Sequence, residues 1–299
     1  MKKVCVIVDH PSRDLVGITY LAQKIISKDY EFILVPMYHW HEILLIRPDI
    51  VILNHGRISE AQSSGIDLIL KYCEEISIEC FVLDNEGGIV DKNVYKKILM
   101  KFSYKHKYFL WGQDKKKLIN KKNFIVTGHP RYDLYKDVNY NSTFLSKISK
   151  KTGKDFILIN TSFPGSNPIK KIHWDAKIID NSINKKIFKN LESENINFKF
   201  FMKCMNKITL KFKEEKFIIR PHPFENINFY REKFGGLSNV KILNKSDVYY
   251  YIKNCKFVIN SNCQTSLETS IMGKNFINIS TKRFDRQSSI IHSLKKPSC

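Results

Sequence analysis

The 299-residue sequence lacks the patterns that mark several large classes of protein. No stretch approaches 18 uninterrupted apolar residues, so no transmembrane helix is predicted. The apolar run near the amino terminus is stopped by Asp9, His10 and Pro11, far short of the apolar core of a signal peptide. No Cys-x-x-Cys pair occurs among seven widely spaced cysteines, which indicates neither a zinc site nor a disulfide framework. We therefore expect a cytoplasmic protein whose cysteines are free thiols.

Acidic residues are scarce relative to basic ones: 29 Asp and Glu stand against 50 Lys and Arg, a formal net charge of +21. Such a surface attracts anions, including phosphorylated small molecules and an anionic membrane face. A composition rich in Lys, Asn and Ile, as AT-rich coding often produces, is the alternative explanation of the same excess. No RRM, KH or helix-turn-helix pattern accompanies the charge, so we expect no nucleic-acid partner. Peripheral contact with an anionic inner membrane remains an expectation from the charge alone.

Continuous apolar segments alternate with segments of helical spacing along the chain. In the first half, strands are predicted at 3–8, 32–35, 49–53, 78–83, 107–111 and 123–126. The pattern restarts in the second half, with strands predicted at 156–160, 216–219, 240–243, 256–259 and 275–279. Continuous apolar strands joined by helices are typical of parallel sheets covered on both faces. We predict an α/β protein of two Rossmann-like, doubly wound domains, 1–140 and 141–299, facing a cleft in which ligands bind beyond the strand ends.

The strongest local signal is Arg220-Pro221-His222-Pro223, directly after a predicted strand. The two prolines fix the backbone and remove two N–H donors, which favours a stiff turn at the carboxyl edge of the sheet. Arg and His side chains together are natural ligands of a phosphate group. The pattern predicts a phosphate-binding site at Arg220, His222 and Pro223. The alternative is a rigid turn that carries a surface histidine.

A second signal, at 260–268, follows a later strand and opens a helix. Hydroxyl groups and unpaired N–H groups at a helix N-terminus bind phosphate well, which makes Ser261, Thr265 and Ser266 candidates. The alternative is N-capping by Thr265 or Ser261, with Glu268 completing a capping box. Capping would use one hydroxyl and leave the rest of the cluster unexplained.

An acidic turn, Asp84-Asn85-Glu86-Gly87-Gly88, follows another predicted strand. A carboxylate at a sheet edge can serve as a general base, or two of them can hold a metal ion for a diphosphate donor. A turn whose glycines adopt positive φ is the structural alternative. We favour the base, because no other acidic cluster completes a metal site, and we expect neither a metal nor another cofactor.

Histidines also follow strands in the first domain. His10 follows the first strand and His55 the third, while the segment after the last strand carries His129 and Arg131. The carboxyl ends of parallel strands share one edge, so these residues are candidates for holding an acceptor in the cleft. Hydrogen-bonded histidines without a ligand, and a hinge turn at 127–133, are the alternatives.

The order of these motifs along the chain resembles that of a known protein family. Along the chain they read D-x-E-G at 84–87, G-H-P-R-Y-D-L at 128–134, R-P-H-P at 220–223 and N-S-x-x-x-T-S-x-E at 260–268. This order and its strand-end placement resemble the bacterial surface carbohydrate biosynthesis protein family. That family is similar to Kdo transferases of capsule and O-antigen assembly and, more remotely, to sialyltransferases. The resemblance spans roughly Val4 to Ile279 and implies a GT-B-like fold with a CMP-sugar donor.

The resemblance also implies roles for individual residues. In the relatives, the H-P motif and a Ser/Thr pair at a helix start contact the nucleotide phosphate, and an N-terminal Asp or Glu is the base. Carried over, these roles fall on His222 and Pro223, on Ser261, Thr265 and Ser266, and on Glu86 with Asp84 in reserve. The chain departs from the family pattern at Asn85, where a second acidic residue is expected. The chain also ends soon after its last predicted strand.

We therefore expect an inverting, metal-independent glycosyltransferase of surface polysaccharide biosynthesis (capsule, O-antigen or lipooligosaccharide). Its partners would be a nucleotide-sugar donor, such as a CMP-activated Kdo-like or nonulosonic acid, and a glycan or glycolipid acceptor. One alternative is a CDP-polyol phosphotransferase of the teichoic-acid polymerase type. The other is a non-catalytic nucleotide-sugar-binding partner protein, which Asn85 and the short end of the chain favour.

Overall fold

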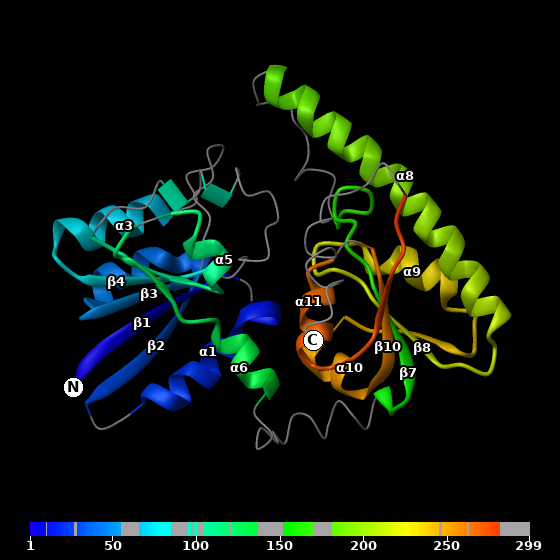
Figure 1. Cartoon of the computed structure of the whole chain (residues 1–299), viewed down its shortest axis with the longest axis horizontal. Coiled ribbons are helices and arrows are strands. Elements are labelled where there is room, and N and C mark those ends of the chain that lie inside the picture. The colour runs from blue at the N-terminus through cyan, green and yellow to red at the C-terminus, as the bar shows by residue number, and fades with distance from the viewer. Residues whose placement is uncertain are drawn as a thin grey trace. The chain divides into compact units, whose positions relative to one another are not determined.

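The computed structural model describes residues 1–9, 11–26, 29–54, 66–84, 95–96, 99–100, 105–119, 121–136, 152–169, 181–244, 247–261 and 263–281. The chain divides into two compact units, Met1–Tyr140 and Asn141–Cys299 (Figure 1). Within the described ranges, no helix is both long enough and apolar enough to cross a membrane.

The first unit contains a six-stranded sheet in the order β2-β1-β3-β4-β5-β6, and all its strands pair in parallel. The strands are β1 (Lys2–Val8), β2 (Tyr30–Pro36), β3 (Ile50–Asn54), β4 (Glu79–Leu83), β5 (Lys107–Leu110) and β6 (Phe124–Val126). The helices around them are α1 (Pro11–Ile25), the 3-10 helix η1 (Met37–Glu42), α2 (Ile43–Ile46), α3 (Ile66–Glu75), α5 (Gln113–Lys116) and α6 (Pro130–Lys136).

Apolar residues of strand β1 fill the cores on both faces of the first sheet. Cys5 and Ile7 pack into the larger cluster with α3, whereas Val4 and Val6 pack into the smaller cluster beneath α1. Successive side chains of a strand point to opposite faces, so an uninterrupted apolar strand needs cover on both sides. This is the doubly wound arrangement predicted from the sequence.

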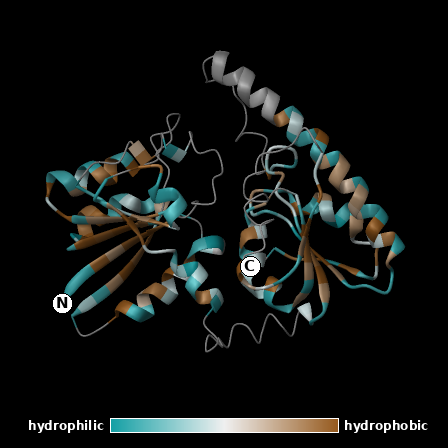
Figure 2. Ribbon diagram, viewed as in Figure 1, coloured by the Kyte–Doolittle hydropathy of each residue, from teal (hydrophilic) through white to brown (hydrophobic). Residues whose placement is uncertain are grey.

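The second unit contains a five-stranded parallel sheet in the order β11-β10-β7-β8-β9. Its strands are β7 (Phe156–Asn160), β8 (Phe217–Arg220), β9 (Val240–Ile242), β10 (Cys255–Asn260) and β11 (Phe276–Asn278). Its helices are α8 (Asn181–Lys211), α9 (Ile227–Phe234), α10 (Val248–Asn254) and α11 (Thr265–Ile271). Helices α8 and α9 cover one face and α10 the other, and Figure 2 shows the apolar residues concentrated in the strands between them.

Strand β7 lies at the centre of the second sheet, where the strand order reverses. From β7 the chain proceeds to β8 and β9 on one side, and then returns to place β10 and β11 on the other. Ligands of open α/β sheets bind at such a reversal, beyond the carboxyl ends of the strands. The loops that follow β7, β8 and β10 therefore form the edge at which a ligand site is expected.

Two short helices are not apparent in the sequence pattern. Helix α6 begins at Pro130, inside the segment for which a hinge turn was one alternative, because proline is favourable in the first turn of a helix. Helix α9 begins after Asn226, whose side-chain oxygen accepts a hydrogen bond from the N–H of Asn228 at 3.0 Å. Both helices are too short for apolar periodicity to reveal them.

Candidate functional site

Arg220 is the last residue of β8 and lies at the carboxyl edge of the second sheet. Its side chain points to the face covered by α10, where its guanidinium carbon lies 5.7 Å from the ring centroid of Tyr251. This contact holds the guanidinium by a cation–π interaction. Only 8% of Arg220 is exposed, so its charge is partly shielded from water and acts more strongly on nearby groups.

His222 lies two residues further on, between Pro221 and Pro223, and is half-buried. Its Nδ1 accepts a hydrogen bond from the N–H of Phe224 at 3.2 Å. A neutral imidazole that accepts at Nδ1 carries its proton on Nε2. The turn therefore fixes the tautomer in which His222 can donate a hydrogen bond to an anion.

The hydroxyl groups after β10 are less alike than the sequence implies. The hydroxyl of Ser261 accepts a hydrogen bond from the side-chain amide of Asn197 on α8 at 2.7 Å. The hydroxyl of Ser266 donates to Asn260 at 3.2 Å, and both serines are 1% exposed. Thr265 is half-buried and is the first residue of α11. Part of Thr265 is exposed, but its hydroxyl oxygen is itself buried.

The N-capping alternative for this cluster is wrong. Helix α11 is preceded by Gln264, which adopts right-handed helical angles and makes no capping hydrogen bond with its side chain. Neither Ser261 nor Thr265 is the cap, because Ser261 bonds to Asn197 instead and Thr265 lies within the helix. The hydroxyl cluster is therefore not explained by helix capping.

The two predicted phosphate motifs are brought together by strand register. Arg220 pairs with Asn160 of β7, and Asn160 pairs with Asn260 of β10, so the three residues form one row across the sheet. Burial raises the pKa of the Cys263 thiol, the Glu268 carboxylate adds to the rise, and the Arg220 guanidinium opposes it. Arg220 is therefore within electrostatic reach of the segment that begins α11. Asn160 was missed in the sequence, although asparagine also ends β10.

A third segment belongs to the same edge and was read from the sequence only as a loop. Residues 161–169 follow β7 and lie beside the turn after β8, where Pro168 and Glu225 form an isolated antiparallel bridge. The side-chain amide of Asn167 donates to the carbonyl of Asn226 at 3.0 Å, and the N–H of Asn226 donates to the carbonyl of Asn167 at 2.9 Å. The two loops form one hydrogen-bonded body.

In the first unit, Asp84 is the only described residue of the predicted acidic turn, and Glu86 lies outside the described residues. Asp84 is 1% exposed, and its carboxylate accepts a hydrogen bond from the hydroxyl of Tyr95. Its carbonyl accepts from the indole N–H of Trp111. Burial, followed by the Asp84 charge, raises the pKa of Tyr95. These contacts describe a carboxylate that holds neighbouring segments together.

His10 and His55 also lie outside the described residues, whereas His129 and Arg131 are described. His129 is 3% exposed, and its Nδ1 accepts a hydrogen bond from the N–H of Arg131 at 3.3 Å. Burial, together with the positive charges of Arg131 and Arg13, lowers the pKa of His129 to about 3. His129 is therefore neutral at physiological pH.

Arg131 is 7% exposed, and its Nε donates to the hydroxyl of Tyr135 one turn along α6 at 2.9 Å. The ring of Trp111 contacts both His129 and Tyr132, with centroid distances of 5.8 and 4.8 Å. Since Trp111 also bonds Asp84, the loops after β4, β5 and β6 are linked. The structure thus brings Asp84 and His129 into one contact chain, with Trp111 between them.

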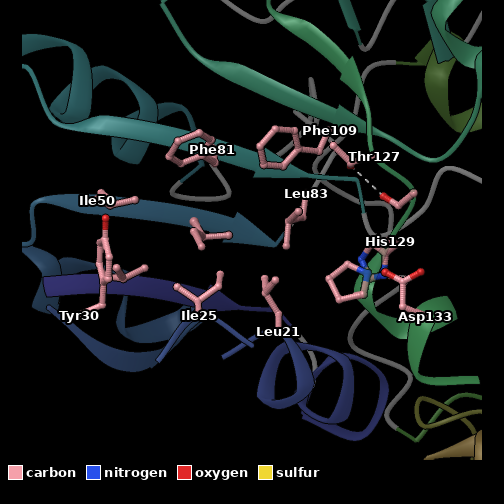
Figure 3. Close-up of a pocket in the computed structure, with 14 residues that line it drawn as sticks. Leu21, Ile25, Tyr30, Ile50, Phe81, Leu83, Phe109, Thr127, His129 and Asp133 are labelled. Carbon is pink, nitrogen blue, oxygen red and sulfur yellow. Dashed lines mark hydrogen bonds between the residues drawn. The ribbon is translucent and has the colours of Figure 1, made fainter. Parts of the chain in front are cut away.

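An apolar pocket of about 420 Å³ lies within the first unit, between α1 and the sheet. Figure 3 shows Tyr30 and Ile50 at one end of it and His129 and Asp133 at the other. The pocket therefore reaches from the body of the sheet to its carboxyl edge. Among the described residues, no group of three or more His, Cys, Asp or Glu side chains is placed to hold a metal ion.

No protein-family model and no curated protein matches the sequence. UDP-GlcNAc 2-epimerase from Methanocaldococcus jannaschii, in complex with UDP-GlcNAc and UDP, is similar in structure, with a TM-score of 0.58 and 11% identity over 99% of this chain and 93% of that chain. The S. aureus MnaA–UDP structure gives a TM-score of 0.56 and 13% identity, over 99% and 89% of the two chains. The wall teichoic acid polymerase TagF with CDPG gives 0.53 and 8%, over 93% and 69%.

These similarities confirm the predicted fold class. The chain has two parallel-sheet, Rossmann-like domains, as GT-B proteins do. The structural neighbours share this fold and do not single out Kdo transferases. At identities of 8–13%, they carry the fold and leave the reaction to the chemistry of the site.

Proposed function

We propose that this protein is a GT-B-type glycosyltransferase of surface polysaccharide biosynthesis that binds a nucleotide-sugar donor at the carboxyl edge of its second sheet. The observation that carries this proposal is the pairing of Arg220 and His222 after β8, with Arg220 in reach of the start of α11. A guanidinium and an imidazole N–H suit the oxygens of a phosphate. Structures of similar fold contain UDP, UDP-GlcNAc or CDPG, which supports a nucleotide ligand.

The proposed reaction is an inverting transfer from a CMP-activated sugar, such as a Kdo-like or nonulosonic acid. The acceptor hydroxyl attacks the anomeric carbon, its proton passes to Glu86, and the bond from that carbon to the phosphate oxygen breaks. CMP leaves with additional negative charge, which Arg220 and His222 stabilise. A monophosphate leaving group needs less neutralisation than a diphosphate, so the proposed step requires no metal ion.

The second candidate is a CDP-polyol phosphotransferase, and the similarity to TagF with CDPG favours it. It would use the same cationic edge, because the leaving group is again a cytidine nucleotide. A non-catalytic nucleotide-sugar-binding partner protein is the third candidate, and Asn85 in the acidic turn favours it. Assays with CDP-glycerol and with CMP-sugars distinguish the two enzymes, and binding without turnover would identify the partner protein.

We also propose that the acceptor is a glycan or glycolipid presented at the anionic face of the inner membrane. The net charge of +21 supports such peripheral contact, because an anionic leaflet attracts basic surfaces. Sedimentation with anionic and with neutral vesicles, at low and at high salt, tests this point. If the protein fails to bind anionic vesicles at both low and high salt, contact with an anionic membrane is excluded.

The decisive experiment is a calorimetric titration with CMP, CDP, UDP and GDP in the presence of EDTA, using wild type and His222→Ala. Metal-free CMP binding that His222→Ala strongly weakens is the expected result for the CMP-sugar class. Tight binding of UDP or GDP would retain the site and change the donor. A folded protein that binds none of the four nucleotides would exclude the transferase.

A further inference from the structure

Glu225 is a buried carboxylate that lies two residues beyond the R-P-H-P motif and has no role in the proposed chemistry. It is 2% exposed. Oε1 accepts hydrogen bonds from the N–H of Phe163 at 2.8 Å and from that of His222 at 3.4 Å. Oε2 accepts from the hydroxyl of Thr161 at 2.9 Å and from that of Tyr230. One side chain thus connects the loop after β7, the turn after β8 and helix α9.

Every backbone N–H group of the turn at 221–225 donates a hydrogen bond within the turn. Pro221 and Pro223 have no N–H, so the donors at 221–225 belong to His222, Phe224 and Glu225. The N–H of His222 donates to the Glu225 carboxylate, that of Phe224 to the His222 ring, and that of Glu225 to the His222 carbonyl at 2.9 Å. All three bonds lie within the turn, so an anion at this turn is bound by side chains.

The orientation of His222 then depends on the conformation of the turn. The ring is held at Nδ1 by the N–H of Phe224, and the backbone at His222 is held by Glu225. If the carboxylate is removed, the turn loses its connections to Thr161, Phe163 and Tyr230 together. A donor aimed in advance costs less entropy when a ligand binds than one that must be ordered.

We propose that Glu225 is the positioning residue of the anion site: it fixes the turn so that Nε2 of His222 is presented as a hydrogen-bond donor. This inference rests on the proposed nucleotide site and adds a residue that does not touch the ligand. The loop at 161–169 is joined to the turn by hydrogen bonds, through Glu225 and through the Asn167–Asn226 pair.

The charge of Glu225 supports this role. Burial raises the pKa of Glu225 to about 7, against the lowering effect of hydrogen bonds from Tyr230, Phe163, Thr161 and His222. The titratable groups that face it are His222 on its own turn and Tyr230 on α9, since the segment 161–169 contains none. A neutral carboxyl and a glutamine amide retain the Oε1 acceptor for the two N–H groups, so Glu225→Gln preserves the geometry that Glu225→Ala destroys.

The test compares nucleotide affinity in Glu225→Ala, Glu225→Gln and the control Glu194→Gln. Glu194 is also 2% exposed and also holds the loop after β7, but it does so through the N–H groups of Gly165 and Ser166 rather than those of Phe163 and His222. We expect Glu225→Ala to weaken binding roughly tenfold or more, and the other two variants to stay within about threefold. Wild-type affinity in Glu225→Ala, or equal weakening in Glu194→Gln, would overturn the inference.

The NMR signal of the His222 ring, assigned by its loss in His222→Ala, gives a readout that needs no nucleotide. It should shift in Glu225→Ala and stay in place in Glu194→Gln, and an unchanged signal in Glu225→Ala would overturn the inference. If wild type binds no nucleotide, the proposed function fails and this signal alone decides the role of Glu225. Should Glu225→Ala not fold, Glu225→Asp replaces it, because the shorter side chain cannot reach both N–H groups. Wild-type affinity and an unshifted signal in that variant would equally overturn the inference.

Discussion

Each unit carries a His-Pro turn at the carboxyl edge of its sheet, and the same type of hydrogen bond forms within each turn. In both, Nδ1 of the histidine accepts from the N–H two residues later: His129 from Arg131 at 3.3 Å, and His222 from Phe224 at 3.2 Å. Their surroundings differ, because His129 is 3% exposed and His222 is half-buried. The local motif thus fixes the tautomer, and the tertiary packing decides whether the second nitrogen can meet a ligand.

A buried ionisable group lies at each turn, and the two groups respond to pH in opposite directions. Glu225 has a folded pKa of about 7, above its ordinary 4.5, so its contribution to stability is present below pH 4.5 and is lost as the pH rises through 7. His129 has a folded pKa of about 3, below its ordinary 6.5, so its contribution is present above pH 6.5 and is lost as the pH falls through 3. Burial causes both shifts, because it disfavours the charged form.

The largest predicted effect is that stability changes with pH in opposite directions in the two units. Slopes of the same sign would contradict the comparison. Each slope is worth on the order of 3–5 kcal/mol over its full window. Hydrogen exchange between pH 4.5 and 6.5 should show protection falling with pH in β7 and β8, and rising with pH in β1 and β3. Glu225→Gln should flatten only the first slope, and His129→Gln only the second. In His129→Gln, the protection of the first unit should still rise slightly with pH, because burial also lowers the pKa of His106.

The second prediction compares the effect on nucleotide affinity of substitutions in each of the two turns. Arg220→Ala or His222→Ala should weaken nucleotide binding by about 1.5–3 kcal/mol, because each removes a hydrogen bond to a charged ligand. Arg131→Ala should leave the affinity within about twofold, since Arg131 is engaged with Tyr135. Calorimetry on the three variants, alongside thermal unfolding, separates binding from stability. Loss of binding in Arg131→Ala alone would place the anion site in the first unit.

The third prediction sharpens the contrast between the two buried carboxylates, Asp84 and Glu225. Both accept a hydrogen bond from a tyrosine hydroxyl, but the Glu225 carboxylate also accepts one from the N–H of His222 in a His-Pro turn. Asp84→Ala should lower the free energy of unfolding by about 1–3 kcal/mol, because it removes the carboxylate that accepts the hydrogen bond of the buried Tyr95 hydroxyl. Asp84→Asn should cost less, since its amide still bonds to that hydroxyl. Urea unfolding measures both, and unaltered stability with abolished turnover would instead make Asp84 the base.

The smallest effect concerns the packing that buries the first turn. A Cβ at Gly17 of α1 would lie 3.1 Å from the backbone of Arg131 on α6, closer than ordinary contact. In an unobstructed helix, Gly→Ala gains roughly 0.5–1 kcal/mol. Here we expect Gly17→Ala to lower the free energy of unfolding by less than about 1 kcal/mol, as measured by urea titration. A full gain in stability would show that α1 and α6 pack less closely than the structure indicates.

Much of the fold could be read from the sequence because its strands are buried on both faces. Strand β7 occupies the predicted residues, since a continuous apolar run leaves few alternatives. The short helices α6 and α9 were not predicted, because seven or eight residues carry too little periodicity. The predicted free thiols at Cys5 and Cys80 are confirmed, since both are buried and unbridged.

The site was predicted in part for a related reason. Arg220 and His222 were found because prolines mark their turn and a strand precedes it. Glu225 and Asn160 were missed, because a single carboxylate or amide in a sequence gives no sign of the partners that fold against it. The roles predicted for Glu86, His10 and His55 stay predictions, since those residues lie outside the described ones.

The sequence by itself determined two parallel sheets, the positions of their strands to within a residue or two, and the stiff turn that the prolines around His222 impose. These follow from interactions between residues close in the chain and from apolar runs that must be covered. Only the tertiary structure decided that Ser261 and Ser266 are buried, that His129 is closed off, and that a distant loop is joined to His222 through Glu225. Burial and electrostatic environment depend on segments far apart in the chain, so no local pattern encodes them.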